Sequence, residues 1–305
     1  SALCPLPSPL CRLVTTMGLV DLHTHSNVSD GLLTPTELIR EARERGVRAL
    51  ALTDHETVAG LAEAESAARL SRIEFVPGVE LNTDVDRHEV HILGYYVNRD
   101  DDEFVTGLAI LEQQRVERIE RMVGQLQEVG TPLDLDRVRE LAGPGTIGRP
   151  HVARAMIERG YVTSVGEAFD RYLASGRPGF VPRRRNEPEA AVRMILANGA
   201  VPVLAHPLTT GNVEGILHRL APAGLLGLEV YYGEYDETIQ QELRATANRW
   251  GLIATGGSDY HGEGFKHGRN LGGPPVPMES VARLREAAAN TQTANGQDAA
   301  PAHSA

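Results

Sequence analysis

Histidines and carboxylates recur in short groups along this chain, and most of the groups follow a short apolar run. In Asp21-Leu22-His23-Thr24-His25 the two histidines stand two residues apart, so on a strand they project from one face. The other groups are Asp30, Thr53-Asp54-His55, Gly78-Val79-Glu80, His91, Ala205-His206-Pro207 and Gly257-Ser258-Asp259-Tyr260-His261. Imidazoles and carboxylates are ligands for Zn²⁺, Mn²⁺ and Fe²⁺, so these groups predict metal binding.

The candidate metal ligands are His23, His25, Asp30, His55, Glu80, His91, His206, Asp259 and His261. Three or four ligands per ion, with one bridging carboxylate, suffice for three divalent ions, whereas two ions would leave ligands over. A lone histidine at a strand end is more often a hydrogen-bonded structural residue, and Asp30 or Asp54 alone could cap a helix or turn a loop. Their conjunction favours metals, because so many ionisable groups are costly to desolvate together without cations.

The elements that must position these ligands alternate between short apolar runs and helical patterns, which is typical of parallel β/α architecture. Candidate strands cover residues 19–22, 49–52, 75–79, 90–96, 200–205, 227–231 and 252–255. Candidate helices between them cover residues 36–45, 58–70, 187–198 and 238–249. Seven strands in this order favour a barrel, and the carboxyl ends of barrel strands converge on the active-site face.

The alternation stops between about residues 100 and 186, where the pattern becomes helical and strongly charged. Helical patterns there cover residues 104–129, 135–141, 151–159 and 164–173. We therefore expect a helical insertion over 101–186 that caps a barrel formed by 17–100 and 187–289. Residues 1–16 are expected to be an extension upstream of a start at Met17, and residues 290–305 a disordered tail.

Composition excludes several classes of protein. The chain has 305 residues, 41% hydrophobic and 23% charged, which is ordinary for a soluble globular protein. Its formal net charge of −11 argues against binding duplex DNA through the phosphate backbone, although cations in a site can still attract phosphate. No run approaches the roughly 18 apolar residues of a membrane span. Both cysteines, Cys4 and Cys11, precede Met17, so we expect a cytoplasmic enzyme without disulfides.

The ordered motifs also resemble those of a known superfamily. They are Asp21-Leu22-His23-Thr24-His25-Ser26, Thr53-Asp54-His55, Gly78-Val79-Glu80, Ala205-His206-Pro207 and Ser258-Asp259-Tyr260-His261. Together, over about residues 19–284, they resemble the PHP (polymerase and histidinol phosphatase) superfamily. The resemblance implies an α/β fold, a distorted seven-stranded (β/α)7 barrel, with a trinuclear metal centre.

The resemblance further implies how the ligands are shared. His23, His25, Glu80 and Asp259 would hold the first ion; Glu80, His91 and His206 the second; and Asp30, His55 and His261 the third. Asp54 would orient a ligand rather than bind metal. Glu80, His206, Asp259 and His261 are the expected catalytic residues among these ligands, and the ions are expected to be Mn²⁺, Zn²⁺ or Fe²⁺.

Three further segments resemble one branch of this superfamily. They are His91-Ile92-Leu93-Gly94-Tyr95, Ile147-Gly148-Arg149-Pro150-His151 and the glycine-rich stretch 261–273. That branch removes the 3′-phosphate from nucleoside 3′,5′-bisphosphates, and some members degrade short RNA from the 5′ end. The implied reaction is hydrolysis of a phosphate monoester by in-line attack of a metal-bridging hydroxide.

Cationic side chains are expected to complete the phosphate grip, because guanidinium groups bind phosphate in a bidentate manner. The candidates are Arg149, Arg184, Lys266 and Arg269. The alternative for each is an exposed side chain or an ordinary ion pair. Phe, Trp and Tyr make up only 5% of the chain, which leaves few stacking surfaces for a long single strand. The expected partner is therefore a small phosphorylated substrate of one or a few nucleotides.

Two other functions remain open. A histidinol-phosphate phosphatase would act on a small amino-alcohol phosphate, for which a large cap and extra arginines would be superfluous. A non-catalytic domain would use its metals structurally or serve a polymerase as an accessory. The complete set of ligand residues argues against that third possibility.

Overall fold

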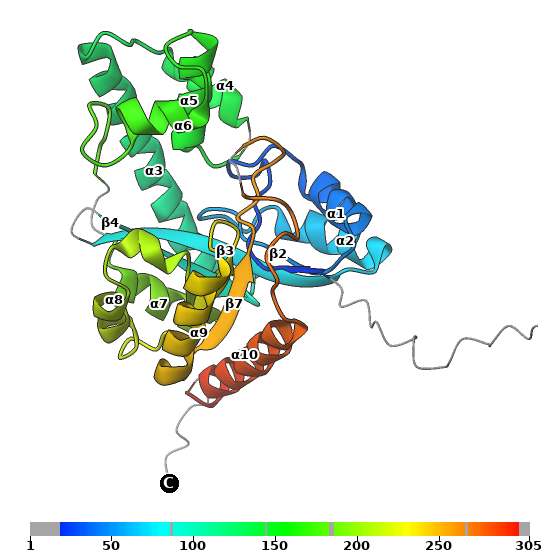
Figure 1. Cartoon of the computed structure of the whole chain (residues 1–305). Coiled ribbons are helices and arrows are strands. Elements are labelled where there is room, and N and C mark those ends of the chain that lie inside the picture. The colour runs from blue at the N-terminus through cyan, green and yellow to red at the C-terminus, as the bar shows by residue number, and fades with distance from the viewer. Residues whose placement is uncertain (1–18, 86–87, 144, 183–185, 266–267, 299–305) are drawn as a thin grey trace, which may run out of the picture.

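One mixed sheet of seven strands, in chain order, forms the body of the protein. The computed structural model describes residues 19–85, 88–143, 145–182, 186–265 and 268–298 (Figure 1). The strands are β1 (Leu19–Asp21), β2 (Val47–Leu52), β3 (Glu74–Val85), β4 (His88–Tyr95), β5 (Val201–Leu204), β6 (Gly227–Tyr232) and β7 (Ile253–Gly257). The sheet nearly closes, because Leu22 N donates to Gly256 O at 3.1 Å and Thr24 bridges to Tyr260. The predicted seven-stranded distorted barrel is confirmed.

The expectation that all strands run parallel is wrong at β4. This strand is antiparallel to both β3 and β5, and Asn82 pairs with His91 across the β3–β4 ladder. Only two residues separate β3 from β4, and a connection that short permits antiparallel pairing alone, since a parallel partner needs a crossover of a dozen or more residues. Glu80 and His91 consequently reach the site from within their strands, not from carboxyl ends.

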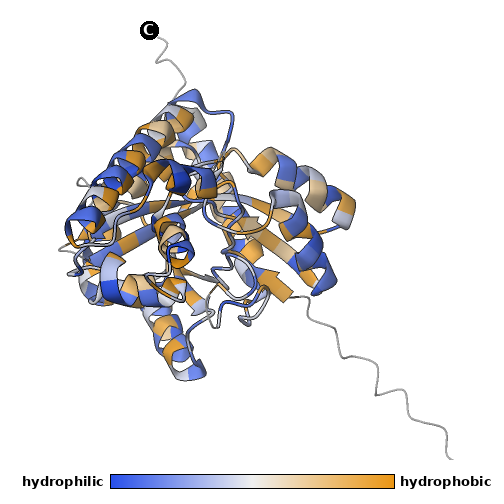
Figure 2. Ribbon diagram, turned by 90° about the horizontal axis from the view of Figure 1, so that it is seen from above, coloured by the Kyte–Doolittle hydropathy of each residue, from blue (hydrophilic) through white to orange (hydrophobic). Residues whose placement is uncertain are grey.

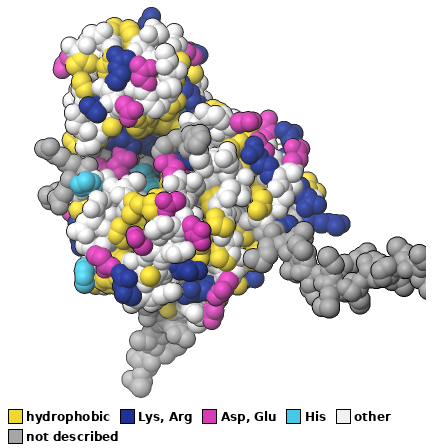
Figure 3. All heavy atoms as spheres, viewed as in Figure 1, with side chains coloured by type: hydrophobic (Ala, Val, Ile, Leu, Met, Phe, Trp, Pro, Cys, Tyr) yellow, Lys and Arg dark blue, Asp and Glu magenta, His cyan; other side chains and the backbone are white. Residues whose placement is uncertain are grey.

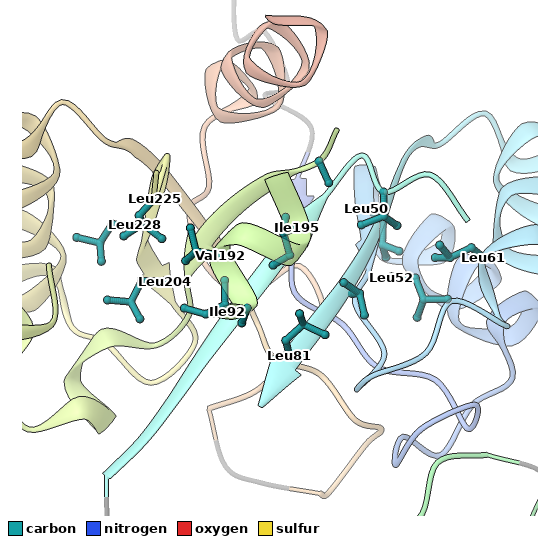
Figure 4. Close-up of a cluster of buried hydrophobic side chains, with 14 of the residues drawn as sticks. Leu50, Leu52, Leu61, Leu81, Ile92, Val192, Ile195, Leu204, Leu225 and Leu228 are labelled. Atoms are coloured by element: carbon teal, nitrogen blue, oxygen red, sulfur yellow. The ribbon is translucent and has the colours of Figure 1, made fainter. Parts of the chain in front are cut away.

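Helices cover the outside of the sheet. They are α1 (Pro35–Glu44), α2 (Leu61–Ser71), α7 (Pro188–Ala197), the 3₁₀ turn η2 (Pro207–Thr210), α8 (Val213–Leu220), α9 (Glu237–Trp250) and α10 (Met278–Asp298). Hydrophobic and hydrophilic residues alternate along them, as Figure 2 shows, which gives each an apolar face to bury. Helix α2 contributes Leu61 and α7 contributes Val192 and Ile195 to a core shared with Leu50 and Leu81 of the sheet (Figure 4).

The predicted disordered tail is wrong for residues 290–298, because α10 continues through them. Three consecutive alanines, Ala287, Ala288 and Ala289, lead into the segment, and alanine has the highest helix propensity. Asn295 also anchors it: its Nδ2 donates to Leu196 O at 2.8 Å and to Ala197 O at 3.0 Å, satisfying carbonyls at the end of α7. Residues 1–16, the expected extension, and residues 299–305 lie outside the described residues.

A helical lobe stands on one end of the barrel (Figure 1). It contains α3 (Asp102–Glu128), α4 (Leu135–Ala142), α5 (Arg149–Glu158), α6 (Val165–Ala168) and the π-helical turn η1 (Phe169–Leu173). Phe104 and Leu108 of α3 pack into the barrel core, whereas Met122 and Leu126 pack into a separate core of the lobe. One continuous helix therefore joins the two cores. Across the described residues, no helix combines the length and apolar character that crossing a membrane requires.

Candidate metal centre and substrate cavity

The structure brings all nine predicted ligand residues together at the end of the barrel beneath the lobe. Each is buried, with at most 8% of its surface exposed. Ligand atoms lie within 4.8 Å of one another in four groups: His25, Asp30, His55 and His261; His23, His206 and Asp259; His23, His25 and Glu80; and Glu80, His91 and His206. Several nitrogen and oxygen donors at this spacing suit a cluster of divalent cations.

Glu80 lies at the centre of this cluster. Histidine nitrogens surround its carboxylate at 2.7–3.2 Å; they belong to His23, His25, His55, His91 and His206. The Oε2 atom faces the first three of these rings, and Oε1 faces the other two. Because its two oxygens point toward different histidine groups, Glu80 has the geometry of a carboxylate that bridges two ions.

The charges in the cluster compensate one another. Burial would raise the pKa of Glu80, but the neighbouring imidazoles hold that pKa well below its usual value. Burial opposes ionisation of Asp259 in the same way, but Arg269 and His23 hold its pKa well below the usual value. Burial would lower the pKa of His25, yet Asp259 and Glu80 raise it to about 9. The carboxylates thus stay ionised and draw positive charge to the site, either as histidine protons or as bound cations.

His25 tests whether these residues fit a cation. Both of its ring nitrogens are buried, and neither has a hydrogen-bond partner among the described residues. Its Nε2 nevertheless lies 3.2 Å from Glu80 Oε2 and 3.2 Å from Asp259 Oδ1. A buried polar atom without a hydrogen bond is costly, and a cation held by Nε2 together with the two carboxylates would satisfy this nitrogen. The residues present fit divalent metal ions.

Glu229 orients two of the candidate ligands, although it was not among the predicted residues. Its side chain is fully buried on β6; Oε1 lies 3.0 Å from His23 Nδ1, and Oε2 accepts from His206 N at 2.6 Å. With Nδ1 engaged, His23 Nε2 faces Glu80. The φ of His206 is 25°, an unfavourable backbone conformation that the second hydrogen bond stabilises. A glutamate between Leu228 and Val230 was the signal in the sequence.

Replacing Glu229 with glutamine should weaken metal binding without unfolding the protein. The amide keeps the shape of the side chain but loses the charge that supports His23, so we expect Mn²⁺ affinity to fall roughly 10–100-fold. Dialysis at graded Mn²⁺ concentrations followed by metal analysis measures this change. Glu237→Gln, an exposed position on α9, is the matched control. Equal Mn²⁺ affinity in the two variants would contradict the role of Glu229.

Asp54 holds the loop that carries Asp30. Its Oδ1 accepts from Ser26 N at 2.8 Å and from Ser29 Oγ at 2.6 Å, and its Oδ2 accepts from Ser26 Oγ at 2.6 Å. Burial raises the pKa of Asp54, which these hydrogen bonds partly offset. Asp54 belongs to none of the four ligand groups. Its hydrogen bonds to Ser26 and Ser29 instead position the loop that carries Asp30.

Asp21, at the end of β1, holds the segment that follows β7 through hydrogen bonds. Ser258 donates to it from Oγ at 2.6 Å and from its backbone N at 2.9 Å, and Gly272 N donates at 2.7 Å. Burial raises the pKa of Asp21 to about 6, against the effect of these hydrogen bonds. The segment carrying Asp259 and the segment carrying His23 are therefore held in register.

A cavity of about 580 Å³ lies above the ligands, between barrel and lobe. The hollow between these two parts, with histidine and charged side chains along it, is visible in Figure 3. The barrel side of its lining includes Asp30, His55, Glu80, His91, His206, Asp259 and His261, and the lobe side includes Arg149, Pro150, Ser164, Val165, Gly166 and Phe169. Its volume lies in the range of small-molecule sites, so it can hold one small ligand directly over the ligand cluster.

Two arginines line the cavity from the lobe. Arg149, a predicted phosphate-binding residue, lies with Nη2 2.6 Å from Glu89 Oε1 on β4, and its guanidinium covers the ring of Phe169 at 5.1 Å. Arg115 on α3 was not predicted; its Nη1 donates to Glu56 Oε2 at 2.7 Å. Both pairs join the lobe to the barrel and so fix the two guanidinium groups in the lining of the cavity.

Arg269 also lines the cavity, but it is closely tied to a candidate ligand. Its Nη1 lies 2.6 Å from Asp259 Oδ2, and its Nε donates to Glu234 Oε1 at 2.8 Å. The pair with Asp259 leaves Oδ1 of that carboxylate facing the histidines. The other two predicted cations, Arg184 and Lys266, lie outside the described residues.

Comparison with known proteins agrees with this geometry. Residues 21–139 match the PHP domain. The chain is 36% identical, over 84% of its length and 91% of the relative's, to a 3′,5′-nucleoside bisphosphate phosphatase of Chromobacterium violaceum. It is 36% identical, over 79% of its length and 89% of the relative's, to a 5′-3′ exoribonuclease of Haemophilus influenzae. A solved structure of a candidate metal-dependent phosphoesterase from Bifidobacterium adolescentis superposes with a TM-score of 0.81 at 28% identity, covering 88% of this chain and 96% of that one.

Proposed function

The chain belongs to the PHP domain family of metal-dependent phosphoesterases, and from that premise we propose that it removes the 3′-phosphate from nucleoside 3′,5′-bisphosphates. The products are a nucleoside 5′-monophosphate and phosphate. The observation that carries the proposal is a cluster of nine buried ligand residues at the floor of a cavity that arginines line. The name of the relative from Chromobacterium violaceum supports the choice of substrate.

Three divalent ions are proposed to occupy the cluster. In the division that the family resemblance implies, His23, His25, Glu80 and Asp259 would hold the first, Glu80, His91 and His206 the second, and Asp30, His55 and His261 the third. The ligand atoms of these residues lie close together in overlapping groups. Bound divalent ions supply a nucleophile at neutral pH and neutralise charge on the phosphate oxygens. Glu80 would be a ligand of two of these ions, and Glu229 contacts His23 Nδ1 and so leaves His23 Nε2 facing Glu80.

The arginines of the cavity have different tasks in this proposal. Arg149 donates to a phosphate of the substrate, and its contact with Glu89 holds the guanidinium over the cavity until substrate arrives. Arg269 acts through Asp259: it binds Oδ2 and so turns Oδ1 toward His23 and His25. Direct contact of Arg184 and Lys266 with the substrate stays a prediction.

Release of phosphate from a panel of substrates tests the proposed activity. With Mn²⁺ present, we expect kcat/KM for adenosine 3′,5′-bisphosphate to exceed that for adenosine 2′,5′-bisphosphate, histidinol phosphate and an aryl phosphate by about tenfold or more, or roughly 1.4 kcal/mol. The 2′,5′-isomer is the matched control, because only the position of one phosphate differs. A preference for histidinol phosphate would overturn the proposal, and no turnover at all would favour a non-catalytic role.

Short RNA is a second proposed substrate, supported by the exoribonuclease name of the Haemophilus influenzae relative. A cavity of about 580 Å³ accommodates a nucleotide at a time, as stepwise removal of terminal nucleotides would require. Release of mononucleotides from a 5′-phosphorylated tetraribonucleotide, compared with its 5′-hydroxyl counterpart, distinguishes this activity from bisphosphate hydrolysis alone.

A further inference from the structure

We propose that Phe169 of the lobe and Phe265 of the segment after β7 form the surface that binds the nucleobase, an inference that rests on the proposed function. The chain has five phenylalanines, and these two line the same cavity as the candidate metal ligands. They come from different parts of the molecule, one from the lobe and one from the barrel. A phosphate held by the ligand cluster would therefore have aromatic surface close to the rest of its nucleotide.

Phe265 lies directly beside the ligand cluster. Its ring stacks on the imidazole of His261, with 4.5 Å between ring centres and 9° between the planes. His261 thus covers one face of the ring, while the half-buried residue also lines the cavity. A planar group that enters beside the reacting phosphate can continue this stack, because offset and parallel aromatic contacts are favourable at such separations.

Phe169 provides aromatic surface on the opposite, lobe side of the cavity lining. It begins the π-helical turn η1, a local irregularity that is frequent at functional sites. Arg149 covers part of the ring at 5.1 Å, so the phenyl group and the proposed phosphate-binding guanidinium form one unit. Three residues earlier, Gly166 leaves space: a Cβ there would meet only Ser164 Oγ within 4 Å, at 3.9 Å. A ligand can therefore reach the lobe wall beside Phe169.

The ligand that these residues would recognise is a planar aromatic heterocycle attached to a phosphorylated sugar. Every nucleobase has a π face, so stacking binds all of them and favours the larger purines. Arg149 supplies a cation beside the aromatic surface, which matches a ligand carrying both a base and a phosphate. A sugar phosphate without a base would leave both rings uncovered and should bind more weakly.

Calorimetric titration of the Mn²⁺-loaded protein with AMP and with ribose 5-phosphate tests this surface. We expect AMP to bind the unmodified protein at least about tenfold more tightly than ribose 5-phosphate. Phe169→Leu and Phe265→Leu should each reduce the affinity for AMP about 5–30-fold while changing that for ribose 5-phosphate less than about twofold. Phe180→Leu is the matched control: Phe180 also belongs to the lobe and lies under an arginine, Arg118 at 5.6 Å, but it does not line the cavity.

Equal weakening of both ligands, or unchanged AMP affinity in both variants, would overturn the proposal. Loss of Mn²⁺ from Phe265→Leu would show that this ring only supports His261, and would overturn its role in base binding. The titration measures binding and not hydrolysis, so its result distinguishes failure of this inference from failure of the proposed function. A protein that binds AMP through both rings but releases no phosphate from the bisphosphate would retain this inference and lose the proposed reaction.

Discussion

Replacing Glu80 with glutamine is expected to lower phosphate release by about 10³-fold or more, with loss of bound metal. The Glu80 carboxylate faces five histidines, and its two oxygens point to different ligand groups. A neutral amide cannot compensate the charge of two ions, and its NH₂ group would point a donor at a metal position. Steady-state rates with adenosine 3′,5′-bisphosphate and metal analysis of the purified variant measure both effects.

The control for this prediction lies on the same strand. Glu74 stands at the start of β3, outside the cluster, where it pairs with Arg285 of α10. Glu74→Gln should keep full activity and metal content, since exposed ion pairs contribute little to stability. Near-normal turnover in Glu80→Gln would contradict the proposal that Glu80 is a ligand shared by two ions.

Removing the metal ions should abolish activity and lower thermal stability. Dialysis against a strong chelator is expected to leave less than about 1% of the rate, and added Mn²⁺ should restore it, because the ions supply the nucleophile and the charge stabilisation. A cation that binds only the folded chain stabilises it by about 2.7 kcal/mol at 100 times its dissociation constant. Thermal unfolding with and without Mn²⁺ measures this shift. Full activity after exhaustive chelation would contradict the proposed reaction.

Proton release offers a second measurement on the same ions. The acidic neighbours hold the pKa of His25 at about 9 and that of His23 well above its usual value, although burial opposes both shifts. These rings therefore carry protons at neutral pH in the metal-free protein, and a cation must displace them to bind the ring nitrogens. Titrating Mn²⁺ in two buffers of different ionisation enthalpy should reveal net proton release, and its absence would show that the cations bind elsewhere.

Local patterns were sufficient to predict most of the barrel. Short apolar runs of strand length predicted all seven strands, and a helical pattern predicted α1, which a reciprocal capping box between Thr34 and Glu37 begins. The candidate ligands were recognisable because most follow directly after an apolar run. A histidine, aspartate or glutamate at the end of such a run was recognisable as a candidate metal ligand from its residue type alone. The sheet then places these ligands at one end of the molecule.

Contacts between distant segments were not predictable in the same way. Glu229 is a charged residue within an apolar strand, but its partner, His23, lies 206 residues away in the chain and is placed beside it only by the fold. Arg115 and Phe169 belong to helices whose amphipathic patterns do not say which of their residues meet the barrel. The helix over 290–298 needed the carbonyls of α7 as partners for Asn295.

By itself, the chain's sequence determined the number and order of the strands and the identity of the nine candidate ligands. Those features depend on periodicity and on residue type, which act over a few neighbouring residues. The tertiary structure alone decided which oxygen of Glu80 faces which histidine and which arginines are already paired with carboxylates. These depend on distances between side chains far apart in the chain, because electrostatic and hydrogen-bond energies change steeply over a few ångströms.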